Sequence, residues 1–168
     1  MKAEVSVRIR NYTEEDLPAI LSVQSRNPQA AQWSQADYSE LASDPWGLIL
    51  VVELDGKSTP TLAGFAASHY VMDEAELRNM AVDPAYQRQG IGRELLAEAT
   101  RRLAEQGVTW IYLEVRASNI SAQKFYYSAG FTLRSRRMDY YNNPREDALV
   151  LSLDISSTSK SHVPENAV

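Results

Sequence analysis

The residues most suited to chemistry are two glycines that stand one residue apart in the stretch DPAYQRQGIGRELL, where a helical pattern begins. Glycine lets a ligand approach the backbone closely, and the free N–H groups at a helix N-terminus bind anions such as phosphate. Gly90 and Gly92 lie at that point, and Gln87, Arg88 and Arg93 flank them with donors. The stretch therefore indicates an anion site, and an ordinary helix start that contains glycine is the alternative.

Two common nucleotide-binding loops do not fit this stretch. A Walker A loop needs lysine followed by serine or threonine after its second glycine, and Arg93 and Glu94 stand there instead. A dinucleotide-binding loop needs a third glycine near the start of a parallel sheet. Here Leu95 takes that place, and the loop follows the fourth predicted strand. A pyrophosphate clamp without a metal ion remains.

Composition limits the other chemistry that the chain can perform. The 168 residues are 44% hydrophobic, which suits one compact domain with a core. The absence of cysteine excludes disulfides, zinc–thiolate sites and a cysteine nucleophile. The two histidines, His69 and His162, are too few for a histidine-rich metal site, so we expect no metal.

Charge and hydropathy indicate where the protein acts. The net charge of −5 disfavours broad nucleic-acid binding and is compatible with a basic partner. The N-terminal segment lacks the apolar core of a signal peptide, and no apolar stretch approaches the length of a membrane span. We therefore expect a cytoplasmic protein that binds neither membrane nor nucleic acid.

Hydrophobic periodicity predicts the elements that position the loop. Strands are expected at 5–12, 46–57, 61–71, 74–82, 108–117, 131–141 and 147–155, and helices at 13–24, 34–42, 92–107 and 119–130. Ser34 and Asp37 are the expected cap pair of the second helix, and Gly130 is expected to close the last one. Residues 156–168 are polar and aperiodic, so we expect a disordered tail there. The pattern predicts one mixed α/β domain over residues 1–155, with a parallel strand pair where a helix crosses between strands.

Several motifs resemble one known family. Gln87, Gly90 and Gly92 fit the pattern Q/R-x-x-G-x-G/A, and their stretch resembles the acetyl-coenzyme A loop of the GNAT superfamily of N-acetyltransferases. The stretches DEAELRNMAV, LEVRASN and RRMDYYNNPREDALVL resemble the RimI-type branch, which modifies a small-subunit ribosomal protein. The resemblance covers roughly residues 5–154 and is strongest over 73–151.

The resemblance implies a fold and a cofactor site. The fold is a single mixed, mostly antiparallel sheet with flanking helices, splayed where acetyl-coenzyme A sits. The pantetheine arm is expected to pair with the backbone of Met80, Ala81 and Val82. The pyrophosphate is expected to be held by the amides of Arg88, Gln89, Gly90, Ile91, Gly92 and Arg93. A plain core strand would explain residues 80–82 equally well.

The resemblance implies a role for each of three further residues. Glu114 is expected to be the general base, which the chemistry needs because a protonated amine cannot attack a thioester. Tyr126 is expected to protonate the departing thiolate, and it fits the family spacing better than Tyr127. Asn119 is expected to bond pantetheine, although the sequence alone reads it as a helix N-cap. Without the resemblance, Glu114 is a solvated strand carboxylate and Tyr126 is an aromatic core contact.

The acceptor side is where this chain departs from the branch. Tyr140, Tyr141 and Trp33 are expected to border the acceptor groove. Glu76 and Arg78 are charged where the branch usually has uncharged residues, so either could change substrate choice, and Glu76 is a rival base.

The resemblance implies transfer of acetyl from acetyl-coenzyme A to a protein N-terminal α-amino group, with a basic ribosomal protein as the expected partner. A small-molecule amine acetyltransferase and a non-catalytic acetyl-coenzyme A sensor are the alternatives.

Overall fold

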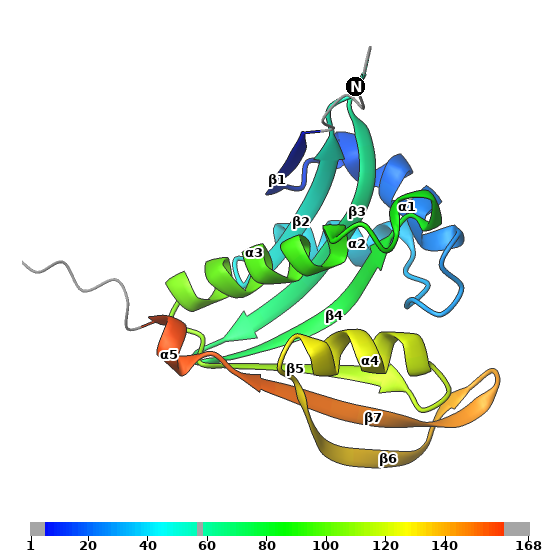
Figure 1. Ribbon diagram of the computed structural model, residues 1–168, viewed down its shortest axis with the longest axis vertical. Helices are drawn as coiled ribbons and strands as arrows, with labels where there is room; N and C mark the ends of the chain where they lie inside the picture. The colour runs from blue at the N-terminus through cyan, green and yellow to red at the C-terminus, as the bar shows by residue number, and fades with distance from the viewer. Residues whose placement is uncertain (1–5, 57–58, 160–168) are drawn as a thin grey trace, which may run out of the picture. The chain divides into compact units, whose positions relative to one another are not determined.

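The computed structural model describes residues 6–56 and 59–159, and its elements follow the predicted order (Figure 1). Val5, expected at the start of the first strand, lies outside the described residues. The elements are β1 (Val7–Asn11), the 3₁₀ turn η1 (Glu14–Asp16), α1 (Leu17–Ser25), α2 (Gln35–Ser43), β2 (Gly47–Leu54), β3 (Thr61–Val71), β4 (Glu74–Val82), the 3₁₀ turn η2 (Pro84–Tyr86), α3 (Ile91–Glu105), β5 (Trp110–Arg116), α4 (Ile120–Ser128), β6 (Thr132–Asn142), β7 (Arg145–Asp154) and α5 (Ser156–Ser159).

Seven strands of the described chain form one sheet in the order β1-β2-β3-β4-β5-β7-β6. The pairs β1–β2, β2–β3, β5–β7 and β6–β7 are antiparallel. β4 and β5 are parallel, because α3 carries the chain from one to the other. The predicted mixed, mostly antiparallel fold is confirmed, whereas the splaying of its strands at a cofactor site stays a prediction.

The chain divides into two compact units. The first unit comprises Met1–His69 and Leu77–Ala99, and the second comprises Tyr70–Glu76 and Thr100–Val168. The single domain expected over residues 1–155 stays a prediction.

The first unit has its core between α1, α2 and the neighbouring strands. The fully buried side chains of Ile20, Tyr38 and Phe65 are central to it. The predicted cap pair of α2 is present, since the amide of Asp37 donates to the Ser34 hydroxyl and the amide of Ser34 donates to the Asp37 carboxylate. These two bonds fix where α2 begins.

The second unit is built on β5, β6, β7 and α4, and β6 and β7 run side by side toward the turn that joins them (Figure 1). Along β5 buried residues alternate with partly exposed ones. Leu113 is buried opposite Leu151 of β7, while Glu114 lies on the other face. Gly130, with a φ of +98°, follows the end of α4 as predicted.

The C-terminal segment, expected to be a disordered tail, begins with a short helix. Ser156–Ser159 form the short helix α5, and the amide of Ser156 donates to Asp154 Oδ1 at 2.9 Å. This bond is an Asx turn that leads from β7 into one helical turn, and the disorder expected of the tail stays a prediction. The rest of that tail, 160–168, lies outside the described residues. In the described part of the chain, no helix combines the length and apolar character needed to cross a membrane.

Candidate active site

The predicted anion loop connects β4 to α3 in the first unit. Two of its residues adopt the left-handed conformation, Arg88 with a φ of +61° and Gly90 with a φ of +84°. Such a φ is uncommon for a residue with a side chain, and strained backbone of this kind occurs at ligand sites. A Cβ added at Gly90 would meet no atom within 4 Å, so the space beside this backbone is open.

The N-terminus of α3 opens from this loop. The amide of Glu94 donates to Gly90 O at 3.0 Å, so the amides of Ile91, Gly92 and Arg93 lie in the first turn of the helix, where no intrahelical acceptor is available. Arg88, Gln89 and Arg93 are exposed around them. First-turn amides, two exposed basic side chains and the positive end of a 15-residue helix fit a pyrophosphate well.

The side chain of Gln87 stabilises this loop through hydrogen bonds. Its Nε2 donates to Val82 O at 2.9 Å and to Asn27 Oδ1 at 3.1 Å. Asn27 Nδ2 also donates to Val82 O, at 3.2 Å. Gln87 therefore ties the loop to the end of β4 and to the segment after α1, which sequence reasoning had not foreseen for this donor.

The end of β4 supplies the three residues expected to pair with pantetheine. Ala81 is buried in the core of the first unit, and Met80 and Val82 are partly exposed. β3 approaches closely here, since a Cβ on Gly64 would lie 2.8 Å from Ala81 O. These residues therefore form part of a core strand, as the alternative interpretation states. Their pairing with pantetheine stays a prediction.

Glu114 lies in a cluster of polar side chains in the second unit. Its side chain is 21% exposed, and Arg137 Nη1 lies 3.3 Å from its Oε1. The Tyr140 hydroxyl bonds the same carboxylate, and this bond, with some burial, raises the pKa of Tyr140. The arrangement is a half-buried carboxylate held by a phenol and a guanidinium, which is chemically suited to accept a proton.

Glu76 lies close to the same cluster. It is exposed, it stands opposite Tyr112 in the β4–β5 register, and its charge adds to the rise in the pKa of Tyr140. The structure therefore brings the rival base near Tyr140 as well. Trp110 and Tyr112 alternate along β5 with Glu114 on the same face, and their rings stack with centroids 6.3 Å apart.

Tyr126 lies on α4 with its ring against two phenylalanines. Its ring centroid is 5.1 Å from that of Phe125 and 5.5 Å from that of Phe131. Burial raises the pKa of Tyr126 to about 12, so the phenol keeps its proton at neutral pH. Tyr127, the other candidate, is 42% exposed.

Asn119 is the N-cap of α4, as the sequence alone indicated. Its Oδ1 accepts the amide of Ala122 at 3.1 Å. The cap uses one lone pair of the side-chain carbonyl oxygen and leaves the NH₂ group as a donor for the predicted bond to pantetheine.

Tyr141 is held from both sides in the second unit. The Arg116 guanidinium lies 4.1 Å from its ring centroid, and Arg116 Nη1 pairs with Glu146 at 3.0 Å. The rings of Tyr140 and Tyr141 meet edge to face at 5.1 Å. Sequence reasoning missed Arg116, Arg137 and Glu146, and no spacing rule would have found them because they come from three different strands.

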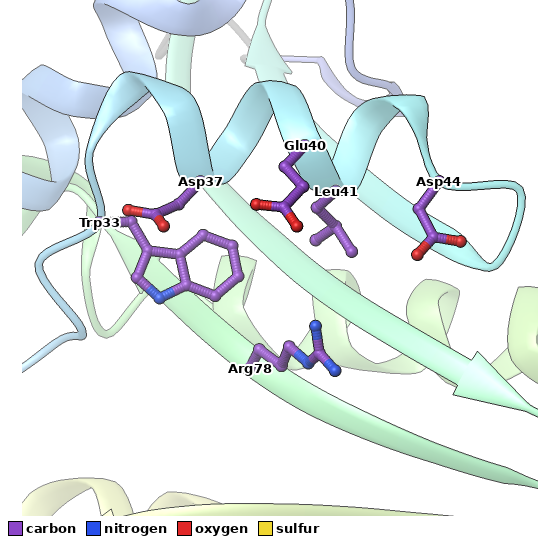
Figure 2. A pocket seen from close by; sticks show the side chains of 6 residues that line it. All are labelled: Trp33, Asp37, Glu40, Leu41, Asp44 and Arg78. Carbon is purple, nitrogen blue, oxygen red and sulfur yellow. The ribbon is translucent and has the colours of Figure 1, made fainter.

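Trp33 lines a separate cavity of about 240 Å³ in the first unit (Figure 2). Its lining residues are Trp33, Asp37, Glu40, Leu41, Asp44 and Arg78. In Figure 2 the Arg78 side chain reaches from β4 toward the carboxylates that α2 presents. The structure thus brings together Trp33 and Arg78, the two residues expected to influence the acceptor from this unit. In the described part of the chain, no three metal-ligating side chains gather at one point.

A buried polar network fixes the segment that carries Trp33. Tyr38 OH donates to Gln24 Oε1 at 2.6 Å and accepts from Asn79 Nδ2 at 3.0 Å, and Gln24 Nε2 donates to Trp33 O at 2.8 Å. Tyr38→Phe removes two hydrogen bonds from this buried network and leaves Asn79 Nδ2 only its bonds to Gln24 Oε1 and Ala31 O, so we expect the free energy of unfolding to fall by about 1–3 kcal/mol. Urea denaturation measures this. Tyr70→Phe removes a more exposed hydroxyl and should cost clearly less, and equal losses would contradict the network's role.

Comparison of the sequence with known proteins and family models identifies one group of enzymes, the acetyltransferases. The sequence model described as the Acetyltransferase (GNAT) family matches residues 9–131. The chain is 41% identical over 143 residues to the [ribosomal protein bS18]-alanine N-acetyltransferase of Escherichia coli K12, covering 84% of this chain and 93% of that protein.

Solved structures agree with this match. The crystal structure of the ribosomal-protein-S18-alanine N-acetyltransferase from Escherichia coli superposes with a TM-score of 0.76 and 36% identity, over 97% of this chain and 99% of that chain. A Bacillus anthracis acetyltransferase solved with acetyl coenzyme A shares the fold, with a TM-score of 0.71 and 20% identity, over 89% of this chain and 99% of that chain.

Proposed function

The chain belongs to the GNAT family of acetyltransferases, and we propose that it acetylates the α-amino group of the N-terminal alanine of ribosomal protein bS18. The N-acetyltransferase activity follows from the family. The observation that carries the choice of acceptor is the 41% identity to the Escherichia coli enzyme, which extends over 93% of that protein's length. A ribosomal protein as acceptor would also place the enzyme in the cytoplasm, as expected from the sequence.

GNAT acetyltransferases use acetyl-coenzyme A, which supplies the acetyl group as a reactive thioester. The open, exposed loop around Gly90 and the N-terminus of α3 support the proposal that these amides hold its pyrophosphate. Gln87 would keep these amides in place, because its side chain donates a hydrogen bond to the last residue of β4. The backbone of Met80, Ala81 and Val82 would pair with the pantetheine arm.

The cofactor loop yields a prediction with a matched control. Gly90→Ala places a side chain in a left-handed conformation that opposes it, so the loop shifts and the KM for acetyl-coenzyme A rises by roughly tenfold. Gly107→Ala creates the same conflict, at a φ of +87° with equally open space, but after the last residue of α3. We expect both variants to lose similar stability and only Gly90→Ala to change the KM for acetyl-coenzyme A. Equal effects of the two variants on this KM would contradict the assignment.

The second unit supplies groups for proton transfer. Glu114 would take the proton from the acceptor ammonium, which frees the amine lone pair for direct attack on the thioester carbon. Tyr126, which keeps its proton at neutral pH, would give one to the thiolate that leaves. Tyr140, Tyr141 and Trp33 would contact the acceptor, and the NH₂ group of Asn119 would bond pantetheine.

The acceptor can be tested against the two alternatives in one assay. Purified protein is given acetyl-coenzyme A with an N-terminal bS18 peptide, a polyamine or an aminoglycoside, and release of coenzyme A is measured. We expect turnover of the peptide alone. Turnover confined to the small amines would favour a small-molecule acetyltransferase. Binding of acetyl-coenzyme A without turnover of any amine would favour a sensor.

A further inference from the structure

We propose that Asp147 is a positioning residue for this reaction, because it holds a bulge in β6 that sets Tyr140 and Arg137 together on Glu114. The inference rests on the proposed function, in which Glu114 is the base. It concerns a residue that touches none of the reacting groups itself and acts through the backbone of the neighbouring strand.

The bulge is visible in the register of β6 and β7. Arg137 lies opposite Ala148, and the next paired residue, Tyr141, lies opposite Glu146. Residues 138–140 therefore face Asp147 alone. At the centre of this bulge Asp139 adopts a φ of +51°, which is uncommon for a residue with a side chain.

The Asp147 carboxylate bonds both sides of the bulge. Its Oδ1 accepts the backbone amide of Asp139 at 2.8 Å, and its Oδ2 accepts Arg136 Nε at 2.6 Å. These bonds lower the pKa of Asp147, so the group is ionised at neutral pH. Its side chain is 12% exposed. Arg145 adds a bond from the turn to the Asp139 carboxylate at 2.7 Å.

The bulge determines which side chains of β6 contact the Glu114 carboxylate. Neighbouring side chains of a regular strand alternate between its faces, so residues three apart point to opposite faces. Arg137 and Tyr140 are three apart, yet Arg137 Nη1 lies 3.3 Å from Glu114 Oε1 and the same guanidinium lies 5.4 Å from the Tyr140 ring centroid. The Tyr140 hydroxyl also bonds this carboxylate. The extra residues of the bulge bring them to one side, while Met138 between them is 71% exposed.

This placement has a chemical consequence for the base. The Tyr140 hydroxyl and the Arg137 guanidinium both donate toward the carboxylate, and these two donors fix its orientation. A general base acts only when it is held within hydrogen-bond reach of the proton it removes. Release of the bulge should therefore weaken catalysis with the peptide and leave binding of acetyl-coenzyme A unchanged.

The test is a double-mutant cycle on the full chain with Asp147→Asn, Tyr140→Phe and the double variant. Asparagine has one acceptor oxygen and no charge, so at most one of the two bonds survives and it is weaker than a bond to the carboxylate. We expect each single variant to lower kcat/KM for the peptide by about tenfold, with the KM for acetyl-coenzyme A unchanged, and the double variant to be no worse than either. Asp154→Asn, at the other end of β7, removes an aspartate that also accepts a backbone amide and should leave kcat/KM unchanged.

An NMR titration tests the role of Asp147 independently of the proposed function. Titration of labelled tyrosines by NMR should show a raised pKa for Tyr140 in the wild type and a value near the ordinary 10 or so in Asp147→Asn. This readout needs no turnover, so it stands even if the peptide is not the acceptor. Arg136→Gln, which removes one partner and keeps the Asp139 bond, should give a smaller shift. An unchanged Tyr140 pKa in Asp147→Asn, or activity losses that add in the double variant, would overturn the inference.

Discussion

Glu114→Gln is expected to lower kcat for peptide acetylation by about 10³-fold, with the KM for both substrates changed by less than about threefold. Glutamine keeps the size and the hydrogen-bonding reach of glutamate but cannot accept the ammonium proton, and a positioned general base contributes 10²–10⁴-fold. The loss corresponds to about 4 kcal/mol of activation free energy. Steady-state kinetics at saturating acetyl-coenzyme A measures it.

Glu76→Gln is the matched control for this prediction, because Glu76 is the other carboxylate whose charge acts on Tyr140. We expect this variant to keep kcat within about threefold of the wild type. If Glu76→Gln were the variant that loses three orders of magnitude and Glu114→Gln remained active, the base would be Glu76. If both kept full activity, the proton would leave by another route.

Tyr126→Phe is expected to lower kcat by about 10²-fold, because the thiolate would then leave without a positioned acid. The ring still fits between Phe125 and Phe131, so the thermal midpoint should shift by only a few degrees. Because burial raises the pKa of Tyr126 to about 12, its ionisation should cause no loss of activity between pH 7 and 10. A pH–rate profile checks this point.

Tyr127→Phe tests the choice between the two neighbouring tyrosines. Its side chain is exposed, and we expect kcat to remain within about twofold of the wild type. A large loss in Tyr127→Phe together with an active Tyr126→Phe would mean that the acid was assigned to the wrong residue.

Much of the fold could be predicted from the sequence because its signals are local. The apolar run within 61–71 and the alternation along 74–82, together with the helical repeat after Gly92, predicted the strands and the crossover helix that make β4 and β5 a parallel pair. Ser34 with Asp37, and Asn119 before α4, were read correctly because capping depends on a few adjacent residues.

The polar surroundings of Glu114 could not be predicted in the same way. Regular alternation places Arg137 and Tyr140 on opposite faces, and only the bulge held by Asp147 brings both to one carboxylate. A bulge depends on a long-range pairing register, which the local pattern of apolar residues in β6 does not encode. For the same reason Gln87 was taken as a donor to the anion, although its amide bonds the end of β4.

Fewer observations support the identity of the acceptor than support the acetyl-transfer reaction. The most direct test therefore determines which nitrogen atom of the acceptor receives the acetyl group. A peptide with an N-terminal alanine, the bS18 sequence and one internal lysine offers an α-amine and an ε-amine to the same enzyme. After reaction with acetyl-coenzyme A, tandem mass spectrometry locates the acetyl group. We predict a single acetyl group on the alanine nitrogen, absent with Glu114→Gln. Acetylation of the lysine alone, or no acetylation of this peptide while a small amine is modified, would contradict the proposed function.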